Sequence, residues 1–236
     1  SEFYLNWGRG FHSNDLRGAT ITVDPASGAS ANRIPLLVRT RGEELGMRTE
    51  VSPRFAVTAA LFRLDIDSEL VFVGDAGTTE ASRGSRRTGT EVTARYSPLS
   101  WLLVDLDYAQ THARFRDDDP VGRFIPGAPD RIMSAKIMVD RLGRWSGSLT
   151  LRHFGARPLI EDNSVRSRGT TLFAGKLGYR FDKRFRLELA GFNLANSKVN
   201  QIDYFYESRL RSEGGPVGDV HFHPAEPRSF RLAGSA

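Results

Sequence analysis

Residues Trp101 to Tyr108 read Trp-Leu-Leu-Val-Asp-Leu-Asp-Tyr, and this stretch carries the pattern that decides the fold. Successive side chains of an extended strand point to opposite faces. One face of the stretch is apolar and carries Leu102, Val104, Leu106 and Tyr108. The other face carries Leu103, Asp105 and Asp107. This period of two predicts a β-strand with one face in an apolar environment.

The same alternation recurs on both sides of this stretch. It occurs in residues 44–51, 91–96, 145–152, 173–181 and 185–189. We count about ten such strands and find no amphipathic helix of normal length. The sequence therefore predicts an all-β protein.

The connections between the strands alternate strictly between short and long. The short ones are Ser52-Pro53-Arg54, Ser97-Pro98-Leu99-Ser100, Leu142-Gly143-Arg144 and Asp182-Lys183-Arg184. The long ones are Arg9–Thr40, Gly74–Ser85, Arg116–Asp130, Ala156–Gly169 and Glu207–Arg228. Successive turns of an up-and-down sheet lie at opposite ends, so the tight turns gather at one end. This asymmetry is typical of an antiparallel transmembrane β-barrel.

The composition narrows the class of protein. The chain has 236 residues, 39% of them hydrophobic, and no cysteine, which excludes a disulfide scaffold and a cysteine nucleophile. No stretch reaches the roughly 18 to 20 apolar residues of a membrane helix. The net charge is +5, but the basic residues are scattered among 28 acidic ones, so no nucleic-acid partner is expected. Ser1 opens directly into a strand-like segment, and we expect any signal peptide to lie upstream.

Two further features agree with a barrel. Aromatic residues flank every short turn, as in the interfacial girdle of a membrane barrel: Phe55, Tyr96, Trp101, Trp145, Phe181 and Phe185. The polar strand face carries many opposite charges, which can pair across neighbouring strands in a wet lumen. A solvated face of an open sheet remains the alternative reading of that face.

Several stretches resemble the barrel of TonB-dependent outer-membrane receptors. They are residues 4–15 (Tyr-Leu-Asn-Trp-Gly-Arg-Gly-Phe-His-Ser-Asn-Asp), Arg41–Gly46, Arg87–Glu91, Phe124–Pro129, Phe192–Asn196 and His223–Leu232. They span nearly the whole chain in the expected order. The resemblance implies a 22-stranded barrel that contains an N-terminal plug. With about ten strands, residues 1–236 are expected to be the C-terminal part of such a barrel, clipped at both ends, with the plug domain and signal peptide absent. The ending Arg231–Ala236 departs from the family because it lacks a terminal aromatic residue.

The function that the resemblance implies is energised uptake of a scarce nutrient across the outer membrane of a Gram-negative bacterium. An iron–siderophore complex is the first expectation, with cobalamin, haem, other metal chelates and oligosaccharides behind it. The implied partners are outer-membrane lipid and lipopolysaccharide, the TonB complex through the absent N-terminal region, and the nutrient chelate. No catalytic residue and no cofactor is expected, so the protein is predicted not to be an enzyme.

The residues predicted to bind ligand lie near the long loops: Trp7, Phe11, His12, Arg83, Arg86 and Arg87. The planar guanidinium group of arginine can donate two hydrogen bonds to a phosphate or a carboxylate. The three arginines could therefore bind lipopolysaccharide or an anionic ferric chelate. A solvated basic rim is the alternative for them, and girdle or loop packing is the alternative for the first three. His221 and His223 alternate on a strand and are weak candidates for a metal site, and packing near Pro224 is the favoured explanation for them. Asp117–Asp119 is an acidic loop tip.

Three other functions fit parts of this pattern. A passive porin or a small closed barrel has the same strands. An outer-membrane lipase needs a Ser and His pair that the sequence does not reveal. A soluble β-sandwich that binds carbohydrate shares the alternation but has no reason to sort its loops by length.

Overall fold

Antiparallel strands account for most of the chain in the computed structural model. The structure describes residues 1–14, 20–23, 28, 30, 35–73 and 78–235, without the side chains of 69–82. The strands are β1 (Glu2–Ser13), β2 (Leu37–Ser52), β3 (Phe55–Val73), β4 (Thr78–Leu99), β5 (Leu102–Phe115), β6 (Arg131–Leu142), β7 (Trp145–Phe154), β8 (Thr170–Arg180), β9 (Arg186–Phe192), β10 (Asn200–Ser208), β11 (Val217–Pro224) and β12 (Ser229–Ser235).

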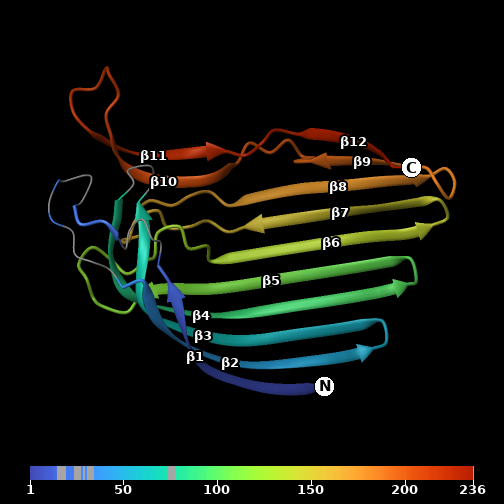
Figure 1. Cartoon of the computed structure of the whole chain (residues 1–236), viewed down its shortest axis with the longest axis horizontal. Helices are drawn as coiled ribbons and strands as arrows, with labels where there is room; N and C mark the ends of the chain where they lie inside the picture. The colour runs from blue at the N-terminus through green and yellow to red at the C-terminus, as the bar shows by residue number, and fades with distance from the viewer. Residues whose placement is uncertain (15–19, 24–27, 29, 31–34, 74–77, 236) are drawn as a thin grey trace.

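Ten of these strands form one curved sheet (Figure 1). Strands β1 to β9 follow one another in chain order, and β12 returns to pair with β9. Every pairing is antiparallel. In the described part of the chain the sheet does not close, because β1 and β12 each have one neighbour. This single consecutive sheet confirms the up-and-down prediction, and the sandwich alternative is wrong.

The sorting of connections by length is confirmed. The short turns lie together at the end of the sheet where both termini are found, and the long loops gather at the opposite end (Figure 1). Three predicted loops are partly wrong. Strands β3 and β4 continue their ladder as far as Val73 and Thr78, so residues 78–85 are strand. The segment 207–228 contains β11, which pairs with β10 as a separate hairpin. The two ends of the predicted loop Arg9–Thr40 belong to β1 and β2, and part of the rest lies outside the described residues.

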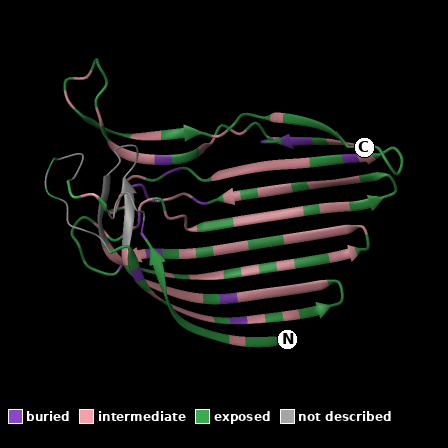
Figure 2. Ribbon diagram, in the orientation of Figure 1, coloured by how far each residue is buried: buried purple, intermediate pink, exposed green. Residues whose placement is uncertain are grey.

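The two faces of the sheet differ in polarity. The register aligns apolar residues into cross-strand rows, such as Leu5, Leu45 and Leu61 on β1 to β3. These three side chains are 54% to 77% exposed, and large exposed apolar residues continue across the same face to β12. The exposed and half-buried positions along the strands are seen in Figure 2. We refer below to this surface as the apolar face and to the opposite surface as the polar face.

Five of the six aromatic residues predicted beside the short turns contact another aromatic ring. Phe55 and Tyr96 pair edge to face, with their ring centroids 5.8 Å apart. Trp145 and Tyr179 do the same at 4.7 Å, and Tyr179 continues to Phe181 at 4.9 Å. Edge-to-face contacts are the favoured geometry of aromatic pairs. They hold neighbouring hairpins together at the level of the turns.

Buried side chains gather at the long-loop end. Phe115 at the end of β5 is 2% exposed and packs with Ala113 and Ile125 of the following loop. The same end contains Ile66 and Val38, which are 7% and 3% exposed. Among the described residues, no helix has the length and apolar character that crossing a membrane requires. The loops therefore supply the packing that the middle of the sheet lacks.

Opposite-face substitutions on β4 test the assignment of the faces. Val92 lies on the apolar face between Ala59 and Tyr108, whereas Thr93 lies on the polar face beside Asp107. We expect Val92→Arg to lower the free energy of unfolding in lipid vesicles by about 2–4 kcal/mol, because the arginine enters hydrocarbon. The matched Thr93→Arg variant should change it by less than about 0.5 kcal/mol. Equal effects in a guanidinium titration would contradict the assignment.

Candidate functional site

The polar face carries charged side chains that pair across strands. Arg95 Nε lies 3.0 Å from Asp105 Oδ1 on the neighbouring strand. Lys176 Nζ lies 3.1 Å from Glu188 Oε1, and Arg186 Nη2 reaches the other oxygen of that carboxylate at 3.4 Å. The Arg95–Asp105 and Lys176–Glu188 contacts confirm the prediction that opposite charges on this face pair across the ladder, whereas Arg186 and Glu188 lie on the same strand. The face therefore offers both charges in a polar environment.

A hollow of about 570 Å³ lies on the polar side of β6 to β9. Its cationic lining is Lys136, Lys176 and Arg186, and Ser146, Ser148 and Thr150 contribute hydroxyls. Asp140 and Glu188 add the carboxylates. A solute on this face meets charged and hydroxyl groups, as it does in the lumen of a wide barrel.

Arg83 joins three segments at the outer end of the polar face. Its guanidinium donates to Asp117 at 2.6 Å and to Glu161 Oε2 at 2.8 Å. It also donates to the carbonyl of Gly122 at 2.9 Å, and it lies 4.3 Å from the centroid of the Phe115 ring. Because the Arg83 side chain is only 15% exposed, these bonds are partly shielded from water. Arg83 thus ties β4 to the loops after β5 and β7.

The two loops also touch directly. The Phe124 amide donates to the Glu161 carbonyl at 2.9 Å. Gly122 has a φ of +130°, and a Cβ there would lie 2.2 Å from the same carbonyl oxygen. Only glycine fits this conformation and this approach. The loops therefore form an ordered rim above the polar face.

The structure divides the six residues predicted to bind ligand between the two faces. His12, Arg83 and Arg87 lie on the polar face. Trp7, Phe11 and Arg86 lie on the opposite face, by the same strand register. Trp7 and Phe11 are 60% and 70% exposed there. The six residues do not form one cluster.

His221 and His223 share one face of the β10–β11 hairpin, and each contacts a tyrosine. The His221 ring stacks on Tyr206 with centroids 3.8 Å apart. His223 meets Tyr204 edge to face at 6.5 Å. Within the described residues, no group of three or more potential metal ligands is found. These ring contacts agree with the interpretation that the two histidines are held by packing.

The sequence did not point to a second link, between Arg157 and Asp203. Arg157 Nη2 lies 3.2 Å from Asp203 Oδ2, and the aspartate side chain is 4% exposed. Asn200 also donates to this carboxylate, at 2.6 Å. The link attaches β10 to the loop after β7. The partners lie 46 residues apart, so local spacing gives no signal of it.

A comparison with protein families identifies the family of this chain. Residues 2–194 match the family model described as TonB dependent receptor-like, beta-barrel. The chain belongs to this family. Its fold and its predicted resemblance are thereby confirmed, and the family places it in the outer membrane of a Gram-negative bacterium.

The relatives agree with the family assignment. The catecholate siderophore receptor Fiu of Escherichia coli K12 is 27% identical over 220 residues, which cover 87% of this chain. The chain spans 27% of the length of that protein. The Fiu crystal structure in its closed form superposes with a TM-score of 0.68 at 21% identity, over 98% of this chain and 32% of Fiu.

Two other solved structures share the fold. The ferric yersiniabactin uptake receptor FyuA of Yersinia pestis superposes with a TM-score of 0.68 at 16% identity. The superposition covers 98% of this chain and 34% of FyuA. The copper transporter OprC has a TM-score of 0.71 at 16% identity, covering 98% and 37%. These relatives are named as receptors and a transporter, and at this identity their structures show the fold.

The Arg83 link predicts how the rim responds to acid. The hydrogen bond from Arg83 holds the pKa of Asp117 below its ordinary value. A lowered pKa in the folded state stabilises the fold above the unfolded pKa of about 4 and is lost as the pH falls through the folded value. Hydrogen exchange in residues 117–124, corrected for intrinsic rates, should stay slow down to about pH 4 and accelerate below it.

The Arg83→Gln variant is the control for this experiment. Its rim should exchange about tenfold faster at pH 7, because glutamine cannot replace the charged hydrogen bonds to Asp117 and Glu161. It should also lose most of the acid dependence. Protection that is unchanged in the variant, or lost already near pH 6, would contradict the role of Arg83.

Proposed function

We propose that residues 1–236 form the C-terminal part of the barrel wall of a receptor for energised nutrient uptake, with an iron–siderophore complex as the nutrient. The observation that carries this proposal is the match of residues 2–194 to the barrel of TonB-dependent receptors. The names of Fiu and FyuA, a catecholate siderophore receptor and a ferric yersiniabactin receptor, support iron chelates as the substrate class.

The chemistry of the polar face supports the same substrate class. Ferric tris-catecholates are anions, and arginine forks bind anionic oxygens in two-pronged geometry. In this proposal His12 and Arg87 contact the chelate at the outer end of the polar face. Arg83 serves this region by holding the rim in place, because its guanidinium already donates to Asp117 and Glu161.

The proposed mechanism is conformational gating and not covalent chemistry. The loops capture the chelate, the TonB complex displaces a plug region by force, and the polar face provides the wall of the passage. No catalytic residue or cofactor is assigned, and the protein is proposed not to be an enzyme. The apolar face contacts the acyl chains of the outer membrane.

Uptake of radioactive iron bound to a tris-catecholate chelator tests this proposal in cells that express the full-length protein. We expect saturable uptake that disappears when TonB is deleted. Arg87→Gln should raise the apparent KM several-fold and leave the maximal rate unchanged, because it weakens capture and not the energised step. Lys183→Gln, in a short turn at the opposite end of the strands, is the matched control.

Two results would contradict the proposal. Uptake that persists without TonB would favour the passive porin. An absence of any iron uptake, with the protein folded in the outer membrane, would exclude ferric catecholates as the substrate.

A further inference from the structure

A cross-strand row of arginines follows the apolar face at its outer end. The register places five residues of β1 to β5 side by side: Arg9, Arg41, Asp65, Arg86 and Arg114. Because cross-strand partners share a face, this row lies on the same face as the Leu5, Leu45 and Leu61 row. Four of its five members are cations.

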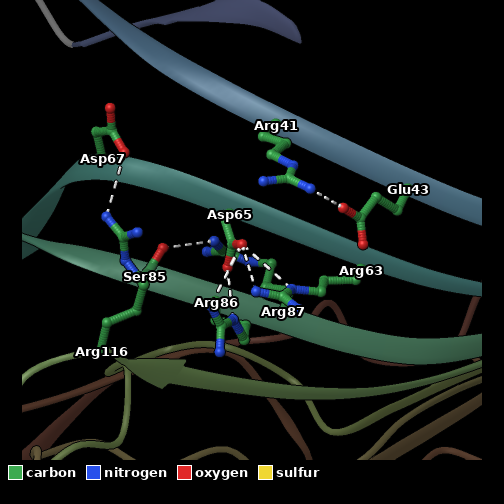
Figure 3. Close-up of polar contacts among 9 residues, drawn as sticks. All are labelled: Arg41, Glu43, Arg63, Asp65, Asp67, Ser85, Arg86, Arg87 and Arg116. Atoms are coloured by element: carbon green, nitrogen blue, oxygen red, sulfur yellow. Dashed lines mark hydrogen bonds and ion pairs between the residues drawn. The ribbon is translucent and has the colours of Figure 1, made fainter. Parts of the chain in front are cut away.

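The chain neutralises the row only in part. Asp65 accepts from Arg86 Nε at 2.6 Å and from Arg63 Nη2 at 2.9 Å (Figure 3). Glu43 pairs with Arg41. Together with Arg63, the row therefore holds five arginines against two carboxylates. In the register, Arg9 faces Arg41 and Arg86 faces Arg114, and like charges directly opposite are unfavourable. An external anion relieves this repulsion.

Three of the five guanidinium groups are open to such an anion, whereas that of Arg114 stacks on the Phe124 ring. The side chains of Arg41, Arg63 and Arg86 are 43% to 52% exposed. Asp65, at 12% exposed, uses two N–H groups of Arg86 and two of Arg63. Each guanidinium has five N–H donors, so three of each remain without an acceptor among the described residues.

The row ends at a basic hollow of about 350 Å³. Arg114 lines this hollow with Arg131 and Arg166. The carboxylate of Asp130 lies 3.7 Å from Arg131 and 3.5 Å from Arg166 and is the acidic group of the lining. Tyr108, Gln110 and His112 come from the side of β5 that faces outward with Arg114. The positive charge therefore continues from β1 to the start of β6 and the loop after β7.

The distance between the arginine row and the short turns indicates which layer of the membrane surrounds the row. Arg86 lies ten residues before Tyr96, which belongs to the aromatic residues at the short turns. Ten strand residues span about 33 Å. With the strand tilted by about 40°, this is about 25 Å, which equals the apolar band of an outer-membrane barrel. The row therefore lies where hydrocarbon ends and lipid headgroups begin.

We propose that the arginine row and its hollow bind the phosphate groups of a phosphorylated outer-leaflet lipid, such as the lipid A part of lipopolysaccharide. The acyl chains of the lipid lie along the apolar face below, and its phosphates lie between the guanidinium groups. A free anion gains nothing from the neighbouring apolar face, whereas a lipid contacts the arginine row with its phosphates and the apolar face with its acyl chains. The inference rests on the outer-membrane location and the proposed lipid contact, and not on the nutrient carried.

The test uses the full-length protein in detergent, with bound lipids counted by native mass spectrometry. Lipid A with two phosphates should bind at least tenfold more tightly than the same lipid after removal of its phosphates, and high salt should weaken it. The double variant Arg41→Gln and Arg86→Gln should lose at least tenfold in affinity. Arg87→Gln is the matched control, because its backbone neighbours Arg86 but its side chain lies on the polar face, beside Ser85.

Each other outcome overturns the proposal. Equal binding of both lipids would do so without any variant, so the test holds even if the double variant fails to fold. Unchanged affinity in a folded double variant would remove the row from the site. Equal loss in Arg87→Gln would show a general charge effect, and full displacement of lipid A by inorganic phosphate at equal concentration would show a free-anion site. Iron uptake is measured separately, so its failure leaves this result interpretable.

Discussion

The backbone hydrogen bonds of the sheet constrain the rest of the structure. A bilayer offers no water to pair with free N–H and C=O groups, so a membrane β-sheet must satisfy them between strands. The antiparallel ladder does this for the strands that lie between β1 and β12 in the sheet. It also forces side chains to alternate, which gives every strand one face for lipid and one for water. The alternation of apolar and polar residues in Trp101–Tyr108 reflects these two environments.

At the outer end the two faces serve different contacts on the same strands. On the polar side, Arg83 gathers two loops into a rim and the opposite charges pair with one another. On the apolar side, arginines exceed carboxylates just where the apolar rows stop. Arg86 and Arg87 are neighbours in sequence, yet the register places Arg86 on the apolar face and Arg87 on the polar face. The same ladder thus places the proposed lipid contact and the proposed nutrient contact at one level.

Alternation and loop length predicted the strands and the short turns at one end, with aromatic residues beside those turns. The family was predicted from the resemblance of six stretches and not from the alternation. Sequence reasoning grouped Arg83, Arg86 and Arg87 because they are close in sequence, although their parity already separates Arg86 from the others, as it separates Phe11 from His12. The partners of Arg83 could not be predicted from the sequence, because Asp117 and Glu161 lie 34 and 78 residues away along the chain. The β10–β11 hairpin was missed because glycine and proline in residues 214–216 marked the segment as loop.

One face of each strand meets lipid and the other meets water. The chain has no cysteine, so single cysteines introduced from position 86 to 96 of β4 report on each side chain separately. With a nitroxide at each position and the protein in lipid, we predict a period of two in collision rates. Oxygen should relax positions 88, 90, 92 and 94 most strongly, and a water-soluble nickel complex should relax 89, 91, 93 and 95. Uniform accessibility to both reagents would contradict the account.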